Sequence, residues 1–250
     1  MIKVLICGAC GKMGANLIEL LSGDGEATAF CGVDPSGAKC AIPVYASFSE
    51  VKQKPDVIID FSSPAALADE LEYAQKNGVP LVLASTGFTR EQLKEVDNAA
   101  NNIAIFRTAN FSLGVNLICE LVKKAAETLG EKFDIEIIEK HHNQKVDSPS
   151  GTALMLAESA NSAFGGSKPY ANGRSGIVGK RANEIGIHAV RGGTIVGEHE
   201  VDFCGEDEII TIAHSARSKK VFAAGAIKAA KWLVGKRPSL YDMKDLLKEI

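Results

Sequence analysis

Short apolar runs alternate with helix-like segments through the first 110 residues of the chain. The apolar runs are of strand length and cover residues 3–7, 27–33, 55–61, 80–84 and 103–106. Helical patterns fill intervals between them, at residues 15–21, 64–76 and 91–98. This alternation predicts a parallel sheet with helices on both faces.

Polar or glycine residues follow each predicted strand, at positions 8–14, 34, 62–63, 85–87 and 110. Ligands of such sheets bind outside the carboxyl ends of the strands. We therefore expect these positions to line one crevice. Turn or cap chemistry explains Ser62 and Ser85 individually just as well.

The pattern changes from residue 116 onward. A helix is predicted to about residue 129, a buried strand at 133–138 and a helix at 153–163, followed by a glycine- and charge-rich loop at 165–186. Three strand-like runs follow, at residues 187–191, 194–203 and 208–214. Gly192-Gly193 predicts a hairpin between the first two runs, and residues 205–207 a second turn. We expect an α/β chain with a Rossmann-like parallel sheet and a second α+β domain, whose sheet is mixed or antiparallel with helices on one face.

A glycine loop follows the first predicted strand, with Gly8, Gly11 and Gly14 in the order G-x-x-G-x-x-G. This spacing is a variant of the dinucleotide-binding fingerprint: the glycines permit a tight turn, backbone approach to the pyrophosphate and close helix packing. Asp34 ends the second strand, about 20 residues on, where a carboxylate binds the adenosine ribose. A glycine-rich turn in an unrelated α/β protein is the alternative.

Residues 139–153, EKHHNQKVDSPSGTA, hold two histidines, a lysine and a helix start. Imidazoles exchange protons near neutral pH, an ammonium adds fixed charge, and a helix N-terminus binds anions. With Ser148 as cap and Pro149 in the first turn, N–H groups near Gly151 and Thr152 are available to a ligand. The block predicts a site that binds and protonates a small anion. Alternatively, the histidines end a strand, Lys145 is a solvated loop residue, and residues 148–150 only begin a helix.

Composition narrows the function classes. The chain has 250 residues, of which 46% are hydrophobic and 24% charged, and a net charge of -3. This charge argues against a nucleic-acid or membrane-surface partner, and the local basic stretches at 174–181 and 217–220 are interpreted as solvated loops. No apolar run has the length of a membrane span, and the first strand leaves no room for a signal peptide, so we expect a cytoplasmic protein.

The six cysteines are scattered through apolar elements, which is typical of reduced packing cysteines. Cys7 and Cys10 form a C-x-x-C, the spacing of some redox and zinc sites, but no second pair accompanies them. We therefore expect no metal.

The chain resembles the 4-hydroxy-tetrahydrodipicolinate reductase family, also called dihydrodipicolinate reductases, over nearly its whole length. The resemblance lies in the glycine loop, residues 85–88 (STGF), 109–112 (ANFS) and 196–199 (VGEH), and above all in residues 139–153. The family's fold implies a dinucleotide-binding domain of residues 1–111 and 222–250 and a substrate-binding and tetramerisation domain of residues 112–221. It also implies a homotetramer assembled through the sheets of the second domains.

The family's reaction implies hydride transfer from a reduced nicotinamide to a small cyclic imine with two carboxylates, in lysine and diaminopimelate biosynthesis. By resemblance, His141 and Lys145 are catalytic, as acid/base group and proton donor. His142, Lys145, Gly151 and Thr152 hold a substrate carboxylate. The cofactor-binding positions are Gly8, Ala9, Cys10, Gly11, Lys12, Met13, Asp34, Ala84, Ser85, Thr86, Thr108, Ala109, Asn110 and Phe111. His188, His199 and His214 are interpreted as structural, while Arg191 and the Gly192-Gly193 turn are candidates to approach the substrate.

Asp34 favours NADH, because a carboxylate repels the additional phosphate of NADPH. Family members that use NADPH well often have arginine in the glycine loop and after the acid, where this chain has Lys12 and Pro35. Lys12 and Lys39 can still supply charge, so we expect NADH to be preferred and NADPH to be possible. Two other classes stay open: a nicotinamide oxidoreductase acting on a sugar or a semialdehyde, and a non-catalytic nicotinamide sensor.

Overall fold

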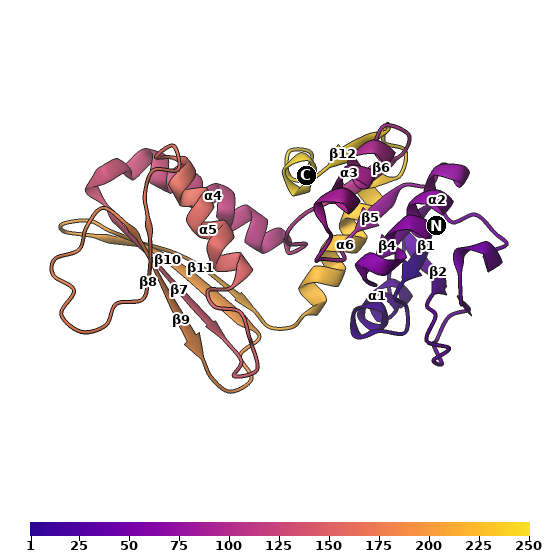
Figure 1. The fold of residues 1–250 in the computed structure, drawn as a ribbon, viewed down its shortest axis with the longest axis horizontal. Helices are drawn as coiled ribbons and strands as arrows, with labels where there is room; N and C mark the ends of the chain where they lie inside the picture. The colour runs from indigo at the N-terminus through magenta and orange to yellow at the C-terminus, as the bar shows by residue number, and fades with distance from the viewer. The chain divides into compact units, whose positions relative to one another are not determined.

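The computed structural model describes residues 1–250, which divide into two compact units. Unit 1 comprises Met1–Ser112 and Lys220–Ile250, and unit 2 comprises Leu113–Lys219. Each unit has its own sheet (Figure 1). None of the helices combines the length and apolar character needed to cross a bilayer.

Unit 1 contains a seven-stranded sheet in the order β12-β6-β5-β4-β1-β2-β3, with all pairs parallel. Its strands are β1 (Ile2–Cys7), β2 (Ala27–Val33), β3 (Val44–Tyr45), β4 (Val57–Asp60), β5 (Leu81–Leu83), β6 (Ala104–Arg107) and β12 (Ser239–Tyr241). The strand order reverses between β1 and β4, the position at which doubly wound sheets bind ligands. The prediction of a Rossmann-like parallel sheet is confirmed.

Helices cover both faces of this sheet, which explains why its central strands are continuous apolar runs. The helices of unit 1 are α1 (Lys12–Ser22), α2 (Leu67–Asn77), α3 (Arg90–Ala99), α6 (Lys220–Leu233) and α7 (Met243–Leu247), with 3-10 turns at Phe48–Glu50 and Pro64–Ala66. Helix α6 packs against α1 and against β4, β5 and β6, so the C-terminal segment completes the layer that the first 112 residues begin. The pattern of residues alone did not predict where this helix packs.

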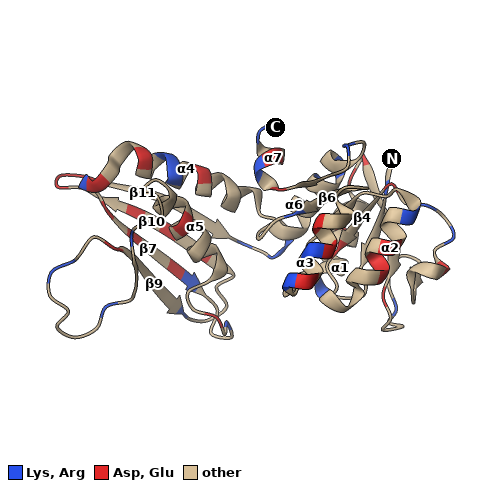
Figure 2. Cartoon of the chain, turned by 45° about the horizontal axis from the view of Figure 1, so that its top comes forward, with Lys and Arg blue, Asp and Glu red and all other residues tan.

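Unit 2 contains a five-stranded mixed sheet in the order β11-β10-β7-β9-β8. Its strands are β7 (Asp134–His141), β8 (Tyr170–Asn172), β9 (Ile185–Arg191), β10 (Gly197–Cys204) and β11 (Ile209–Ala216), and its helices are α4 (Leu113–Leu129) and α5 (Gly151–Ser162), with a 3-10 turn at Gly130–Lys132. Both helices lie on one face of the sheet (Figure 1). Basic and acidic positions alternate along α4 (Figure 2), where Lys123 and Lys124 approach Glu127. The prediction of a mixed sheet with helices on one face is confirmed.

The predicted hairpin at Gly192-Gly193 is wrong. Strand β7 lies between β9 and β10, parallel to β9 and antiparallel to β10. A glycine pair between two strands favours a tight turn. Strand β7, whose buried face carries Ile135 and Ile137, instead pairs along both of its edges and so separates β9 from β10. The turn at residues 205–207 does join paired strands, β10 and β11.

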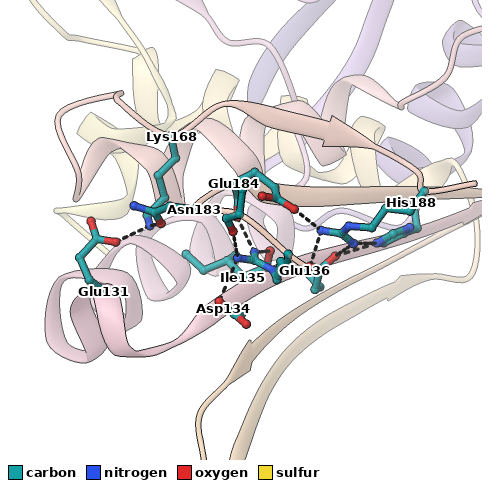
Figure 3. A network of polar contacts seen from close by, with 11 residues as sticks. Glu131, Asp134, Ile135, Glu136, Lys168, Asn183, Glu184 and His188 are labelled. Carbon is teal, nitrogen blue, oxygen red and sulfur yellow. Dashed lines mark hydrogen bonds and ion pairs between the residues drawn. The ribbon is translucent and has the colours of Figure 1, made fainter. Parts of the chain in front are cut away.

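The boundaries of two other predicted segments also differ. The strand expected to end at residue 138 continues to His141, and the expected loop at 165–186 contains β8 and the start of β9. Arg174 and Arg181, expected in a solvated stretch, instead bind Glu136 of β7 (Figure 3). These ion pairs tie the segment back onto the sheet.

Candidate active site

The side chains of β7 alternate between a buried and a half-exposed face, with Ile135, Ile137, Glu139 and His141 on the buried one. The buried stripe thus begins apolar and ends in a carboxylate and an imidazole. Register sets their neighbours: His199 of β10 lies opposite Glu139, and Arg191 of β9 lies opposite His141. The strand period of two therefore carries the ionisable groups into the protein interior.

Glu139 is the centre of this cluster, with a side chain that is 0% exposed. Its carboxylate accepts hydrogen bonds from both terminal nitrogens of Arg191, each at 2.7 Å, and from the Ser150 backbone N–H at 3.0 Å. It also contacts His141 Nδ1 at 2.5 Å. Burial raises the pKa of the Glu139 carboxyl, but the hydrogen bonds from Arg191 and His141 outweigh it and lower the pKa below its ordinary value. Glu139 is therefore an anion at neutral pH.

An anionic Glu139 fixes the protonation pattern of the His141 ring. A carboxylate only accepts, so the Nδ1 beside it carries hydrogen and Nε2 is the nitrogen that can exchange a proton. A Cβ added to Gly197 would lie 3.0 Å from this Nε2, so glycine there keeps space beside it.

Ser150 links the cluster to helix α5. Its Oγ accepts the Ala153 N–H at 3.1 Å as the helix N-cap and lies 2.9 Å from His199 Nε2. The expected cap, Ser148, lies two residues before the actual one, and Pro149 precedes the helix. Ser150 occupies the N-cap position because its backbone N–H also binds Glu139, which orients Ser150 at the helix start.

His199, interpreted as structural from the sequence, belongs to this cluster. Its ring lies 5.1 Å from the His141 ring, edge to face, and contacts Ser150. Burial, followed by the charge of His141, lowers the pKa of His199 to about 4. His199 is thus neutral at neutral pH, and it packs beside His141 without adding charge.

Lys145 and His142 lie on the segment between β7 and α5. Lys145 Nζ binds Asp147 Oδ1 at 2.7 Å and Oδ2 at 2.9 Å, and this hydrogen bond lowers the pKa of the Asp147 carboxyl. The carbonyl of Asp147 accepts from Arg191 at 2.8 Å, which ties Lys145's partner to the Glu139 cluster. His142 Nδ1 is buried without a hydrogen-bond partner. Gly151 and Thr152 form the first residues of α5.

The glycine loop of unit 1 has the backbone geometry expected for binding phosphate. Gly8 has a φ of +73°, and a Cβ on Gly14 would lie 2.4 Å from the carbonyl oxygens of Gly8 and Ala9. Helix α1 begins at Lys12 with Gly11 as N-cap and no side-chain cap. Its first N–H groups therefore receive no hydrogen bond from a capping side chain, as at helix N-termini that bind phosphate.

The other predicted cofactor positions of unit 1 follow the carboxyl ends of parallel strands at the same edge of the sheet. Asp34 follows β2 and accepts the Cys10 backbone N–H at 3.0 Å. Burial raises the pKa of the Asp34 carboxyl, but hydrogen bonds from Ser36 and Cys10 lower it overall. Residues 84–86 follow β5 and residues 108–111 follow β6. Phe111 is 4% exposed and its ring packs against Phe61 and Phe106.

Sequence reasoning missed Glu139 as the partner of His141, Asp147 as the partner of Lys145, and Ser150 as the link from Glu139 to helix α5. Arg191, a candidate to approach the substrate, binds Glu139 through its guanidinium. A signal existed for Glu139: it lies two residues before His141 on a strand, hence on the same face. No sequence signal paired Lys145 with Asp147 beyond their spacing.

Family models match both parts of the chain. The model "Dihydrodipicolinate reductase, N-terminus" matches residues 2–111, and "Dihydrodipicolinate reductase, C-terminus" matches residues 114–247.

Several proteins are similar to this chain over its full length. A 4-hydroxy-tetrahydrodipicolinate reductase of Caldanaerobacter subterraneus is 50% identical, covering 100% of this chain and 99% of that protein. The one of Clostridium novyi is 43% identical over 99% of each. The structure of a dipicolinate-bound dihydrodipicolinate reductase from Paenisporosarcina has a TM-score of 0.81, 27% identity and 97% coverage of both chains. A scyllo-inositol dehydrogenase of Lactobacillus casei, at 12% identity and a TM-score of 0.61, shares only the fold. The chain belongs to the dihydrodipicolinate reductase family.

Proposed function

We propose that this chain reduces 4-hydroxy-tetrahydrodipicolinate, via dihydrodipicolinate, to tetrahydrodipicolinate with NAD(P)H, in lysine and diaminopimelate biosynthesis. Family membership over the full length supports this proposal. The observation that carries it is the Glu139–His141 pair, in which a buried carboxylate holds Nδ1 and leaves Nε2 for proton exchange.

Unit 1 supplies the cofactor site. The pyrophosphate binds at the glycine loop and the start of α1, Asp34 binds the adenosine ribose, and residues 84–86 and 108–111 line the nicotinamide end. A reduced nicotinamide, when bound, supplies the hydride. The close packing of helix α1 on the loop, which Gly14 permits, and the uncapped helix start support this assignment.

Unit 2 supplies the substrate and proton chemistry. His142, Lys145 and the helix start at Gly151 and Thr152 bind a carboxylate of the cyclic imine, each charge-assisted hydrogen bond contributing about 1.5–3 kcal/mol. Lys145 donates the proton that the electron-rich product needs, and His141 acts as the acid/base group. The unpartnered Nδ1 of His142 supports a ligand role, since a buried polar nitrogen without a partner is unfavourable. In this mechanism Asp147 releases Lys145 to the substrate.

The test is oxidation of NADH with enzymatically generated substrate. We expect His141→Ala and Lys145→Ala each to lower kcat by about 10²–10⁴-fold, the contribution typical of a positioned proton donor. His188→Ala is a matched control, because His188 binds Glu136 on the half-exposed face. Unchanged turnover in both test variants would reject the site. Turnover of a sugar or semialdehyde without the imine would favour the other oxidoreductase class, and cofactor binding without turnover would favour the sensor.

We further propose that NADH is preferred over NADPH. Asp34 is anionic at neutral pH and lies beside the glycine loop, at the proposed ribose position, where it repels a 2′-phosphate. The ratio of kcat/KM for the two cofactors measures this preference, and Asp34→Asn is expected to shift the ratio toward NADPH. An equal or higher efficiency with NADPH in the unaltered protein would contradict the preference.

We propose that the working form is a cytoplasmic homotetramer assembled through the sheets of unit 2. Exposed apolar side chains on these strands support an interface, since Val190, Ile209 and Ile210 are 45%, 66% and 36% exposed. The six free cysteines are typical of a reducing compartment. Light scattering of the purified protein tests the assembly, and a monomeric mass would contradict it.

A further inference from the structure

Two thiols lie where two loops of the proposed cofactor site contact each other. Cys10 lies in the glycine loop, and Cys40 lies in the segment after β2 that begins with Asp34. Cys10 Sγ is 3.4 Å from the carbonyl oxygen of Ala38, and Cys40 Sγ is 3.7 Å from that of Ala9. Each thiol therefore donates to the opposite loop, at a position within two residues of the other cysteine.

Both thiols are accessible to a small reagent. Cys10 and Cys40 are each partly exposed and line one pocket of about 420 Å³. Cys7, the other member of the C-x-x-C, differs from them because it is 1% exposed and its thiol binds Glu70 Oε1 at 3.2 Å. The structure thus pairs Cys10 with Cys40, which is distant in sequence, and not with its C-x-x-C neighbour.

We propose that Cys10 and Cys40 are a reversible disulfide pair that joins the two loops and weakens cofactor binding. The oxidant is a peroxide. The thiolate of one cysteine attacks the O–O bond of hydrogen peroxide, which leaves a sulfenic acid and, after protonation, one water. The second thiol attacks that sulfur, forms the S–S bond and releases the other oxygen as water. Two electrons pass from the sulfur pair to the peroxide, and a dithiol reductant reverses the change.

We expect Cys10 and Cys40 to be oxidised slowly at neutral pH. Burial, with additions from the Asp34 carboxylate and the Cys40 thiol, raises the pKa of the Cys10 thiol, although a hydrogen bond from Ser36 opposes this. The thiolate is the reactive form, so a raised pKa leaves less of it. The pair therefore responds to sustained oxidation, not to a brief pulse of peroxide.

The effect on cofactor binding follows from what each loop holds, and it rests on the proposed use of NADH. The glycine loop binds the pyrophosphate through its backbone, and Asp34 binds the ribose. The Cys10 N–H already binds Asp34 Oδ2 at 3.0 Å. A covalent bond between the loops restricts their movement, so any adjustment of the loops around the cofactor strains the cross-link.

The experiment compares reduced and peroxide-treated protein. Thiols are counted under denaturing conditions, the joined peptides are identified by mass, and NADH binding is followed by its fluorescence. We expect the thiol count to fall from six by the two of Cys10 and Cys40. The NADH dissociation constant should rise at least about fivefold, the lower end of typical site-to-site coupling, and return on adding dithiothreitol.

Three variants serve as controls, each compared with its own reduced form. Cys10→Ser and Cys40→Ser should show no peroxide effect on NADH binding. Cys204→Ser, which alters a partly exposed thiol of unit 2, should respond as the unaltered protein does. A disulfide between other cysteines, or this one with unchanged affinity, overturns the inference. If the reduced protein binds no NADH, the proposed function is overturned, and so is the proposed effect of the disulfide on cofactor binding. The mass measurement then still shows whether Cys10 and Cys40 form a disulfide.

Discussion

Buried carboxyl groups are treated in opposite ways by the two units. Asp60 and Glu70 of unit 1 are each 1% exposed, and Glu139 of unit 2 is 0% exposed. Burial, with the charge of Asp60 added, holds the pKa of Glu70 well above its ordinary value, and burial likewise raises the pKa of Asp60. Glu139 has its pKa lowered, because Arg191 and His141 outweigh the effect of burial.

This difference in the pKa of buried carboxyl groups reflects how each unit builds its site. Unit 1 leaves its buried carboxyl groups without a cationic partner and presents backbone groups at the ends of parallel strands. Unit 2 holds charged side chains in place by pairing them. Glu136 repeats this design on the half-exposed face, where Arg174, Arg181 and His188 surround it (Figure 3). Substitutions should therefore act through charge in unit 2 and through shape in unit 1.

The largest difference is expected between Glu139→Gln and Glu70→Gln. Glu139→Gln leaves the Arg191 charge without its counterion and should lower the free energy of unfolding by about 3 kcal/mol. Glu70 favours its neutral form, so Glu70→Gln should cost less than about 1.5 kcal/mol. Chemical unfolding at neutral pH measures both. Equal losses would remove the distinction between the two units.

Shape should decide the next effect. Gly14→Ala places a Cβ 2.4 Å from two backbone carbonyl oxygens and should cost about 1–3 kcal/mol, with weaker NADH binding because the glycine loop must move. Gly23→Ala, at the other end of the same helix, has no atom within 4 Å of the added Cβ and is the matched control. The melting temperature and the NADH dissociation constant test this pair. A Gly14→Ala protein as stable as the control would show that the loop is not closely packed.

Helix caps allow a smaller comparison. Ser150 is 2% exposed, caps α5 and contacts His199, whereas Thr89 caps α3 at the surface in a reciprocal pair with Gln92. Ser150→Ala should cost about 2 kcal/mol and Thr89→Ala about 1 kcal/mol, the upper and middle parts of the range for lost caps. Only Ser150→Ala should also lower kcat, because it frees His199 beside His141. Equal kinetic losses would place the Ser150 effect outside the cluster.

The sequence predicted unit 1 more completely than unit 2 for a physical reason. Strands of a parallel sheet that is covered on both faces are local apolar runs, and each is followed by its own turn, so no pairing partner has to be known. In unit 2 the partner of each strand decides the topology. Gly192 and Gly193 favour a local turn, and nothing within those residues reveals that β7 lies between the flanking strands.

The site shows the same limit. Residue types and spacing pointed to His141, His142 and Lys145, because proton chemistry needs such groups close together. The ion pair between Glu139 and Arg191 joins residues 52 apart, which only the register of β7 and β9 brings together. Sequence spacing does reveal pairs on one strand, such as Glu139 and His141, because strand period fixes the face.

The smallest effect separates the two units by the sign of their pH dependence. The hydrogen bonds to Arg174, His188 and Arg181 outweigh burial and lower the pKa of Glu136 to about 2 from 4.5. Its stabilisation is therefore present above pH 4.5 and is lost as the pH falls toward 2. Glu70 has a raised pKa, so its contribution is present below 4.5 and is lost as the pH rises. One proton limits each slope to about 1.4 kcal/mol per pH unit.

Glu136→Gln should flatten the acid side of the curve of unfolding free energy against pH, and Glu70→Gln should raise the unfolding free energy above pH 4.5. If both variants change the curve in the same direction, pairing with arginine is not what distinguishes the carboxyl groups of unit 2 from those of unit 1.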